Sequence, residues 1–238
     1  MSERQQAELG LPAPVTTARG QGPDGSEVFW HVAEETPVAI MLNSAPWAVM
    51  MASPSDLEDF AAGIAITEKL VPAYADIAGI LVMPVDGGLC ADIATTATVS
   101  APARNVEGRT GCGLCGVTDI ADVVALPEPK GAPAFALTAE AAGRAFRSLA
   151  GHQPLNALCH SVHAAGWCAP DGTVLMARED VGRHNALDKL IGALLRQGLD
   201  PTQGFAVMSS RASFELVRKC VAAGIPHLAA ISAPTGLA

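Results

Sequence analysis

The stretch GFAVMSSRASFELVRKCVAAGIPHLAAIS, Gly204 to Ser232, indicates the fold most clearly. An apolar strand over Gly204–Ser210 is followed by a helix between Ser213 and Gly224 and then by a second apolar strand over His227–Ser232. Strand, helix and strand in this order predict a parallel, right-handed βαβ unit whose strands are buried on both faces.

The carboxyl ends of these two strands are the expected ligand-binding edge. In sheets with parallel strands, ligands bind outside the carboxyl ends. The end of the first strand is formed by Ser209, Ser210 and Arg211, and the end of the second strand by residues 232–235. The sequence therefore predicts hydroxyl groups and one guanidinium at this edge.

The same kind of pattern extends towards the N-terminus. Helical spacing of apolar residues predicts helices over 138–151 and 185–198, with a strand over 172–180 between them. Together with the βαβ unit, these elements predict an α/β core over 136–238. A Pro-rich linker over 126–135 precedes this core.

The preceding part of the chain is predicted to be rich in β-structure. Residues 27–53 predict three short strands in an antiparallel meander. A capping-box pattern from Ser55 to Glu58 then predicts the start of an amphipathic helix. Two further strands are expected over 79–85 and 90–100.

Length, charge and the first residues limit the class of protein. The 238 residues fit one large domain or a domain with a smaller appendage. We expect a flexible leader over 1–26 and a β-rich part over 27–125, followed by the linker and the core. The net charge of −9, with 15 dispersed basic residues, gives no electrostatic basis for binding nucleic acid. No apolar run approaches the roughly 18 residues of a membrane span, and the leader lacks a signal-peptide core. We therefore expect a soluble, cytoplasmic protein.

The segment GRTGCGLCGVTD, Gly108–Asp119, places Cys112 and Cys115 three positions apart among four glycines. A redox pair would need the first cysteine at a helix N-terminus, and the glycines disfavour a helix there. The two thiols could also be inert neighbours in a tight turn. A third interpretation is a mobile sulfur or acyl carrier, with Arg109 favouring the thiolate.

A zinc site is the fourth interpretation, because Cys-x-x-Cys is the usual half of a structural zinc site. Its second half would have to come from Cys159, His160 and His163, which lie more than forty residues away. This spacing matches no compact ligand pattern. The residues alone leave all four interpretations open.

A second polar segment, REDVGRHNALDK over residues 178–189, directly precedes an apolar helix. Arg183 and His184 would lie at the helix N-terminus, which is itself an anion-binding position. Alternatively, Asn185 or His184 caps the helix and the charged side chains are solvated.

Several separated segments together resemble one family, the formate dehydrogenase accessory sulfurtransferases (FdhD). The segments are VAEETPVAIMLN, MMASPSDLEDFAAGIAITE, RTGCGLCGV, REDVGRHNALDKLIG, SSRASFELVRKCVAAGIP and AISAPTGLA. They run in the family's order from about Val32 to Ala238, which is nearly everything after the leader.

The resemblance implies a sulfurtransferase that accepts sulfur as a persulfide from a cysteine desulfurase. The sulfur then passes to the bis-molybdopterin guanine dinucleotide cofactor needed by the formate dehydrogenase catalytic subunit. By this resemblance Cys112 carries the persulfide, and Cys115 either relays the sulfur or releases it through a transient disulfide. The residues expected to hold the anionic, guanine-containing cofactor are Arg183, His184, Ser209, Ser210 and Arg211.

The resemblance also implies a homodimer with a cytidine-deaminase-like, three-layer α/β core. The zinc signature of deaminases, H-x-E with P-C-x-x-C, is absent from the sequence, so deaminase chemistry and a tightly held metal are not expected. Two alternatives to the sulfurtransferase are a non-catalytic chaperone that holds the cofactor and a structural zinc protein.

Two features depart from the family pattern. Residues 159–165 keep His163, expected as a core or hydrogen-bonding residue, but lack the family's glycine. Family members also continue beyond Ala238 through a strand and a glycine- and basic-rich tail that contributes to cofactor binding, so we expect a shortened chain. The cysteines without motif support are Cys90, Cys159, Cys168 and Cys220. We expect Cys220, in the apolar stripe of its helix, to belong to the core.

Overall fold

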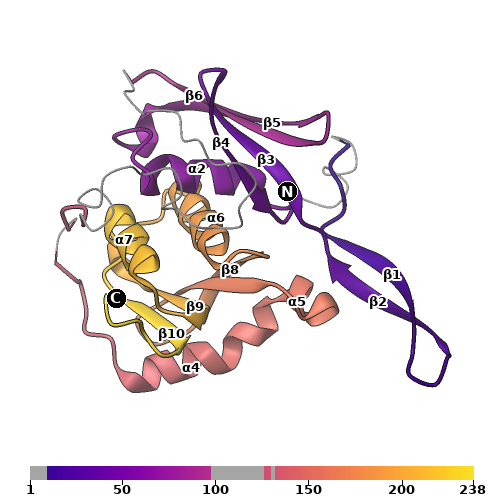
Figure 1. Cartoon of the computed structure of the whole chain (residues 1–238). Helices are drawn as coiled ribbons and strands as arrows, with labels where there is room; N and C mark the ends of the chain where they lie inside the picture. The colour runs from indigo at the N-terminus through magenta and orange to yellow at the C-terminus, as the bar shows by residue number, and fades with distance from the viewer. Residues whose placement is uncertain (1–9, 98–125, 130–131) are drawn as a thin grey trace.

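The computed structural model describes residues 10–97, 126–129 and 132–238 (Figure 1). The first half of the chain forms a four-stranded sheet in the order β4-β3-β6-β5. Its strands are β3 (Thr36–Leu42), β4 (Ala45–Ala52), β5 (Ile77–Val85) and β6 (Gly88–Thr95). The β3–β4 and β5–β6 pairs are antiparallel hairpins, and β3 and β6 join the two hairpins in parallel.

Helix α2 (Leu57–Thr67) covers one face of this sheet, and ten of its eleven residues are buried. Its side chains Phe60, Ile64 and Leu57 pack with Val38 and Ile40 of β3, all of them fully buried. The helix is buried on nearly every side because other helices cover its second face. A short 3₁₀ turn, η1 (Tyr74–Asp76), then leads to β5.

The second half forms another four-stranded sheet, in the order β10-β9-β7-β8. Its strands are β7 (His163–Cys168), β8 (Val174–Asp180), β9 (Phe205–Arg211) and β10 (Leu228–Ser232). Helices α6 (Arg183–Arg196) and α7 (Phe214–Ala223) cover the face towards α2, and α4 (Ala139–Leu149) covers the other. Figure 1 shows the resulting layers: sheet, α2, the α6–α7 pair, sheet and α4. Three shorter helices connect them: η2 (Ala150–His152), α5 (Pro154–Cys159) and η3 (Pro201–Gln203).

Helices α2 and α6 join the two halves and approach each other at glycines. A Cβ atom added to Gly63 of α2 would lie 1.9 Å from Asp188 O, and one added to Gly192 of α6 would lie 1.8 Å from Asp59 O. Only residues without a side chain allow two helix backbones to come this close. The pairing of 63 with 188 and of 59 with 192 also shows that the helices run antiparallel.

Lys219 and Asp188 form a paired, buried cluster among α2, α6 and α7. Lys219 Nζ of α7 donates to both carboxylate oxygens of Asp188 on α6, at 3.0 and 2.9 Å. It also donates to Thr67 Oγ1 at 3.0 Å and Glu68 Oε1 at 2.8 Å, both from α2 and its end. Buried charges persist only when they are paired in this way.

The predicted βαβ unit is confirmed in its pairing and corrected in its burial. Strands β9 and β10 pair in parallel and α7 connects them. Residues Phe205, Ala206, Val207 and Met208 of β9 are fully buried. Strand β10, however, is an edge strand and its Ile231 is 63% exposed, because no described element lies beyond it in the sheet. The strand is therefore not buried on both faces.

The N-terminal predictions need two corrections in strand arrangement. Residues 15–21, expected within a flexible leader, form strand β1 (Val15–Gln21). This strand pairs with β2 (Glu27–Ala33) in a separate two-stranded sheet, which projects from the rest of the molecule (Figure 1). The expected meander is thus confirmed only for β3 and β4. Periodicity predicted the strands but not their partners, because pairing depends on contacts distant in sequence.

The predicted capping box at the start of α2 is wrong. The residue before the helix is Asp56, in the left-handed region at φ 51°, and its side chain makes no capping hydrogen bond. Ser55 Oγ is buried without a partner. The first-turn carboxylates of Glu58 and Asp59 instead pair with Arg196 of α6. These ion pairs join the start of α2 to α6, but they do not satisfy the backbone amides that a cap would.

Candidate functional site

The candidate site lies at one edge of the C-terminal sheet, where three strands end and two helices begin. Strand β7 is antiparallel to β8 and β9, and β10 is parallel to β9, so β8, β9 and β10 point the same way. Two residues separate the end of β8 from the start of α6, and two separate the end of β9 from the start of α7. The amino ends of both helices therefore face this edge, which favours an anion there.

Unsatisfied polar atoms gather at these helix starts. Among the described residues, the buried side-chain atoms without a hydrogen-bond partner include Arg183 Nε, His184 Nε2 and Asn185 Oδ1 from α6 and Ser213 Oγ from the start of α7. Buried polar atoms are normally paired. Of these four, His184 Nε2 is close to Glu215 and Asn185 Oδ1 is an acceptor, which leaves Arg183 Nε and Ser213 Oγ as donors for a ligand. Arg183 and Ser213 supply donors of the kind that phosphate groups accept.

His184 and Glu215 connect the first turns of the two helices. His184 Nε2 lies 2.6 Å from Glu215 Oε2, although the angles do not meet those of a hydrogen bond. Both side chains are largely buried. The contact fixes the spacing between the amino ends of α6 and α7, so His184 takes part in shaping the site.

His163 starts β7 and lies opposite Asp180 in the strand register. Burial lowers the pKa of His163 below 6.5, and the positive charges of Arg183 and His184 lower it further. The structure therefore brings His163 into the same electrostatic environment as the two predicted anion-binding residues. The prediction of a hydrogen-bonding or core role did not anticipate this placement.

The three predicted residues at the end of β9 differ in what they offer. Ser209 Oγ accepts a hydrogen bond from Ala164 N at 2.8 Å, so it ties β9 to β7. Ser210 is buried, and its hydroxyl donates to Arg211 O at 3.1 Å. Arg211 is exposed at the end of the strand. Ser209 and Ser210 thus build the edge, whereas the Arg211 side chain is available to a ligand.

The alternative interpretation of the segment 178–189 is contradicted. Gly182 is the residue before α6, and His184 and Asn185 lie inside the first turn, so neither caps the helix. The charged residues are not solvated either: Asp180 and Lys189 are fully buried, with Lys189 Nζ 2.6 Å from Asp180 Oδ2. The charged residues of this segment therefore include a buried ion pair and are not all exposed to solvent.

Cys112 and Cys115 lie outside the described residues. Of the proposed second half of a zinc site, Cys159 donates its thiol to Leu155 O at 3.1 Å. No cluster of three or more His, Cys, Asp or Glu side chains that could hold a metal occurs within residues 10–97, 126–129 and 132–238. In the same residues, no helix is both long and apolar enough to cross a membrane.

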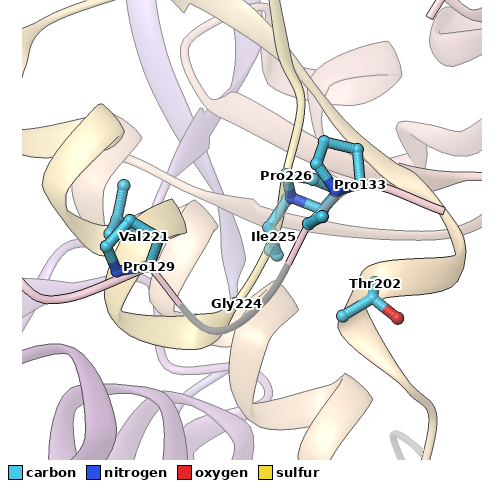
Figure 2. Close-up of a pocket in the computed structure, with 8 residues that line it drawn as sticks. Pro129, Pro133, Thr202, Val221, Gly224, Ile225 and Pro226 are labelled. Atoms are coloured by element: carbon cyan, nitrogen blue, oxygen red, sulfur yellow. The ribbon is translucent and has the colours of Figure 1, made fainter. Parts of the chain in front are cut away.

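A pocket lies at the opposite end of α7. Its lining comes from the Pro-rich segment, the end of α7 and the turn into β10, and Figure 2 shows Val221, Ile225 and Pro226 facing Pro129 and Pro133. The cavity measures about 190 Å³. Among the described residues, its lining is formed by proline, alanine, valine, isoleucine, glycine and one threonine.

Comparison with known proteins identifies the family. The model of the FdhD/NarQ family matches residues 33–238. The chain belongs to the FdhD/NarQ family. A family member from Bordetella petrii named sulfur carrier protein FdhD is 49% identical, over 87% of this chain and 76% of its own length. Another of that name, from Chromobacterium violaceum, is 47% identical over the whole chain and 90% of its own length.

A solved structure extends the likeness to the fold. A crystal structure described as that of a formate dehydrogenase accessory protein from Desulfotalea psychrophila superposes with a TM-score of 0.71. It is 26% identical and covers 94% of this chain and 85% of its own. The mixed α/β arrangement described above is thus shared with an FdhD-like protein.

Sequence reasoning missed two sets of residues in this FdhD/NarQ protein, one beside the candidate site and one at the contact between α2 and α6. Ser53, at the end of β4, contacts Asp180 across more than a hundred residues, and no local pattern signals such a contact. Gly63 and Gly192 interrupt helical segments, and an isolated glycine inside a helix often has a packing reason. That signal was present in the sequence and could have been used.

Proposed function

We propose that this chain is a sulfur carrier for the maturation of formate dehydrogenase. It would accept sulfur from a cysteine desulfurase and transfer it to the bis-molybdopterin guanine dinucleotide cofactor. The observation that carries the proposal is the edge where α6 and α7 begin with unpartnered Arg183 Nε and Ser213 Oγ. Membership of the FdhD/NarQ family and the names of its members support the same function.

The edge suits a phosphate-rich acceptor. Two helix amino ends carry partial positive charge, and Arg183 and Arg211 add two full charges. Arginine binds phosphate oxygens through a planar pair of donors. The cofactor is an acceptor substrate in this proposal, and these residues would hold its pyrophosphate ends. His163, kept neutral by its lowered pKa at neutral pH, can accept a hydrogen bond beside them.

The chemistry falls to Cys112 and Cys115 of the loop. The Cys112 thiolate attacks the outer sulfur of the desulfurase persulfide; the sulfur–sulfur bond of the donor breaks, and the donor cysteine leaves as a thiolate. Cys112 then carries the persulfide. In one route Cys115 attacks Cys112, forming a disulfide and releasing the outer sulfur as a hydrosulfide equivalent, and a thiol reductant later restores both thiols. In the other route the persulfide sulfur first moves to Cys115.

Finer features belong to the same proposal. The three layers formed by α4, the C-terminal sheet and the α6–α7 pair support a cytidine-deaminase-like core. A homodimer, a cytoplasmic location and contact with the formate dehydrogenase catalytic subunit follow from family resemblance. The term sulfurtransferase describes the persulfide transfer above.

Persulfide formation is the direct test. The purified chain is incubated with a cysteine desulfurase and cysteine, and intact and peptide mass spectra are recorded. We expect the added mass of one sulfur atom on Cys112, lost in Cys112→Ser and kept in the matched control Cys159→Ser. No sulfur on either loop cysteine would refute the transfer and favour a non-catalytic cofactor-binding chaperone.

Nucleotide binding tests the acceptor half of the proposal, with guanosine diphosphate as the probe in calorimetry. Arg183→Ala and Arg211→Ala should each weaken binding about tenfold or more, because a hydrogen bond to a charged group contributes about 1.5–3 kcal/mol. Arg144→Ala, on the exposed face of α4, is the matched control and should leave the affinity unchanged. Equal affinities in all four proteins would remove these residues from the site.

A further inference from the structure

The carboxylate of Asp180 holds together three segments that meet beside the site. Its Oδ2 accepts a hydrogen bond from Ser53 N at 2.9 Å, and its Oδ1 accepts from Gly182 N at 2.8 Å and from Asn185 Nδ2 at 2.9 Å. Lys189 Nζ lies 2.6 Å from Oδ2. With these four donors the carboxylate is fully occupied, so it does not itself contact a ligand.

The bonds of Asp180 determine where α6 begins. Gly182 is the residue before the helix, and no side chain caps it. Its amide is one of the four that the first turn leaves without an intrahelical partner, and Asp180 accepts from it. The amides of Arg183, His184 and Asn185 then point outward from a fixed first turn, where an anion can accept from them.

Ser53 secures the same turn from the N-terminal half of the molecule. Its hydroxyl accepts from Val181 N at 3.1 Å, and its carbonyl accepts from Lys189 Nζ at 2.9 Å. Asn185 Nδ2 donates to Met51 O at 2.8 Å in addition to Asp180. The end of β4 and the start of α6 are therefore locked together around one carboxylate.

Lys189 also prevents Asp180 from opposing an anion. An uncompensated carboxylate beside the helix start would repel phosphate, whereas the fully buried pair has no net charge. The amino end of α6 and Arg183 then present positive charge at the edge.

We propose that Asp180 is a positioning residue for anion binding at the amino end of α6, acting through Gly182, Asn185, Lys189 and Ser53. This inference rests on the proposed function, because the anion is the phosphate end of the acceptor. It goes beyond that function by assigning the geometry of the site to a residue that touches no ligand.

A matched pair of variants tests the inference. Asp180→Asn removes the charge that Lys189 pairs with. Asp188→Asn is the control in a second buried cluster, away from the helix starts, where it removes one of the two carboxylates that pair with Lys219 and leaves Glu68. Affinity for guanosine diphosphate is measured by calorimetry, alongside thermal unfolding and persulfide loading of Cys112. We expect Asp180→Asn to bind at least tenfold more weakly and Asp188→Asn less than twofold more weakly, with similar losses of thermal stability.

Each of the other possible outcomes also supports or refutes the role of Asp180. Equal loss of affinity in both variants would show a general effect of stability, and unchanged affinity in Asp180→Asn would overturn the inference alone. Absence of binding by the unaltered chain would overturn the anion site itself, whereas failed persulfide loading by that chain would refute only the sulfur chemistry. If Asp180→Asn does not fold, Asn185→Ala, which removes the bonds from Asn185 Nδ2 to Asp180 Oδ1 and Met51 O, should weaken binding two- to fivefold. Unchanged binding in that variant would refute the role.

Discussion

Gly192 of α6 is the position where we expect one added methyl group to have a large effect on stability. A Cβ atom there would lie 1.8 Å from Asp59 O and 2.9 Å from Gly63 N, both backbone atoms of α2. Ordinary contacts of a Cβ atom begin at 3.4 Å. Gly192→Ala therefore requires the two helices to separate locally by about 1.5 Å.

The expected loss follows from two opposing effects. Alanine is favoured over glycine inside a helix by about 1 kcal/mol. Overpacking a core typically costs about 1–3 kcal/mol, and occasionally more. Because α2 and α6 each pack on their own sheet, neither can move without loosening other contacts. We expect a net loss of about 2 kcal/mol, which corresponds to a fall in Tm of about 4–8 °C for a chain of this size.

Thermal and urea unfolding would measure this loss, with Gly143→Ala of α4 as the matched control. Gly143 is also inside a helix, but a Cβ atom there would meet only the end of the Arg147 side chain at 3.3 Å. The same substitution should therefore stabilise the protein by up to about 1 kcal/mol. If Gly192→Ala and Gly143→Ala changed the free energy of unfolding in the same direction, the close approach of α2 and α6 would not be what excludes a side chain at Gly192.

Two further predictions concern the titrating side chains. Burial raises the pKa of the Cys168 and Cys220 thiols to about 12, so in the native protein both should resist an alkylating reagent that labels the partly exposed Cys159. Mass spectrometry of peptides from the native and the unfolded chain would compare the labelling of the three cysteines. Labelling of Cys168 or Cys220 in the native protein would contradict the packing. Burial, and then the charge of Arg183, lower the pKa of His163. The imidazole therefore takes up its second proton at a higher pH in the unfolded chain than in the native protein. The free energy of unfolding should consequently fall as the pH is lowered below 6.5. In urea unfolding, His163→Gln should make the free energy of unfolding less dependent on pH between 6.5 and the lower pKa of the native histidine. An unchanged pH dependence in this variant would show that His163 does not cause it.

The C-terminal half was largely predictable because its signals are local. The helix between Ser213 and Gly224 is read from its apolar spacing and from a terminal glycine, which does adopt the left-handed conformation at φ 82°. Likewise the helix over 185–198 corresponds to α6, which begins only two residues earlier, at Arg183. The exception is β7 (His163–Cys168), which pairs with the next strand, β8, but was not predicted from the sequence.

The N-terminal half was harder to predict for the opposite reason. Strand β6 joins β3 in parallel, across the whole of α2 and β5, and β2 leaves this sheet to pair with β1. The start of α2 carried a capping-box pattern, yet Glu58 and Asp59 pair with Arg196, far along the chain. Local preferences are weak compared with such tertiary contacts.

The sequence by itself predicted most of the helices and strands, but not β1 or β7, and it indicated the family. It also offered the candidate groups, which stay predictions: Cys112 and Cys115 for sulfur, and Arg183, His184 and Arg211 for an anion. The tertiary structure decided how the predicted anion-binding groups are held. It placed the starts of α6 and α7 at one edge and surrounded Asp180 with donors from β4 and α6. The physical reason is that periodicity specifies which side of an element faces the core, whereas the partners of a buried charge are set by chain segments that meet only after folding.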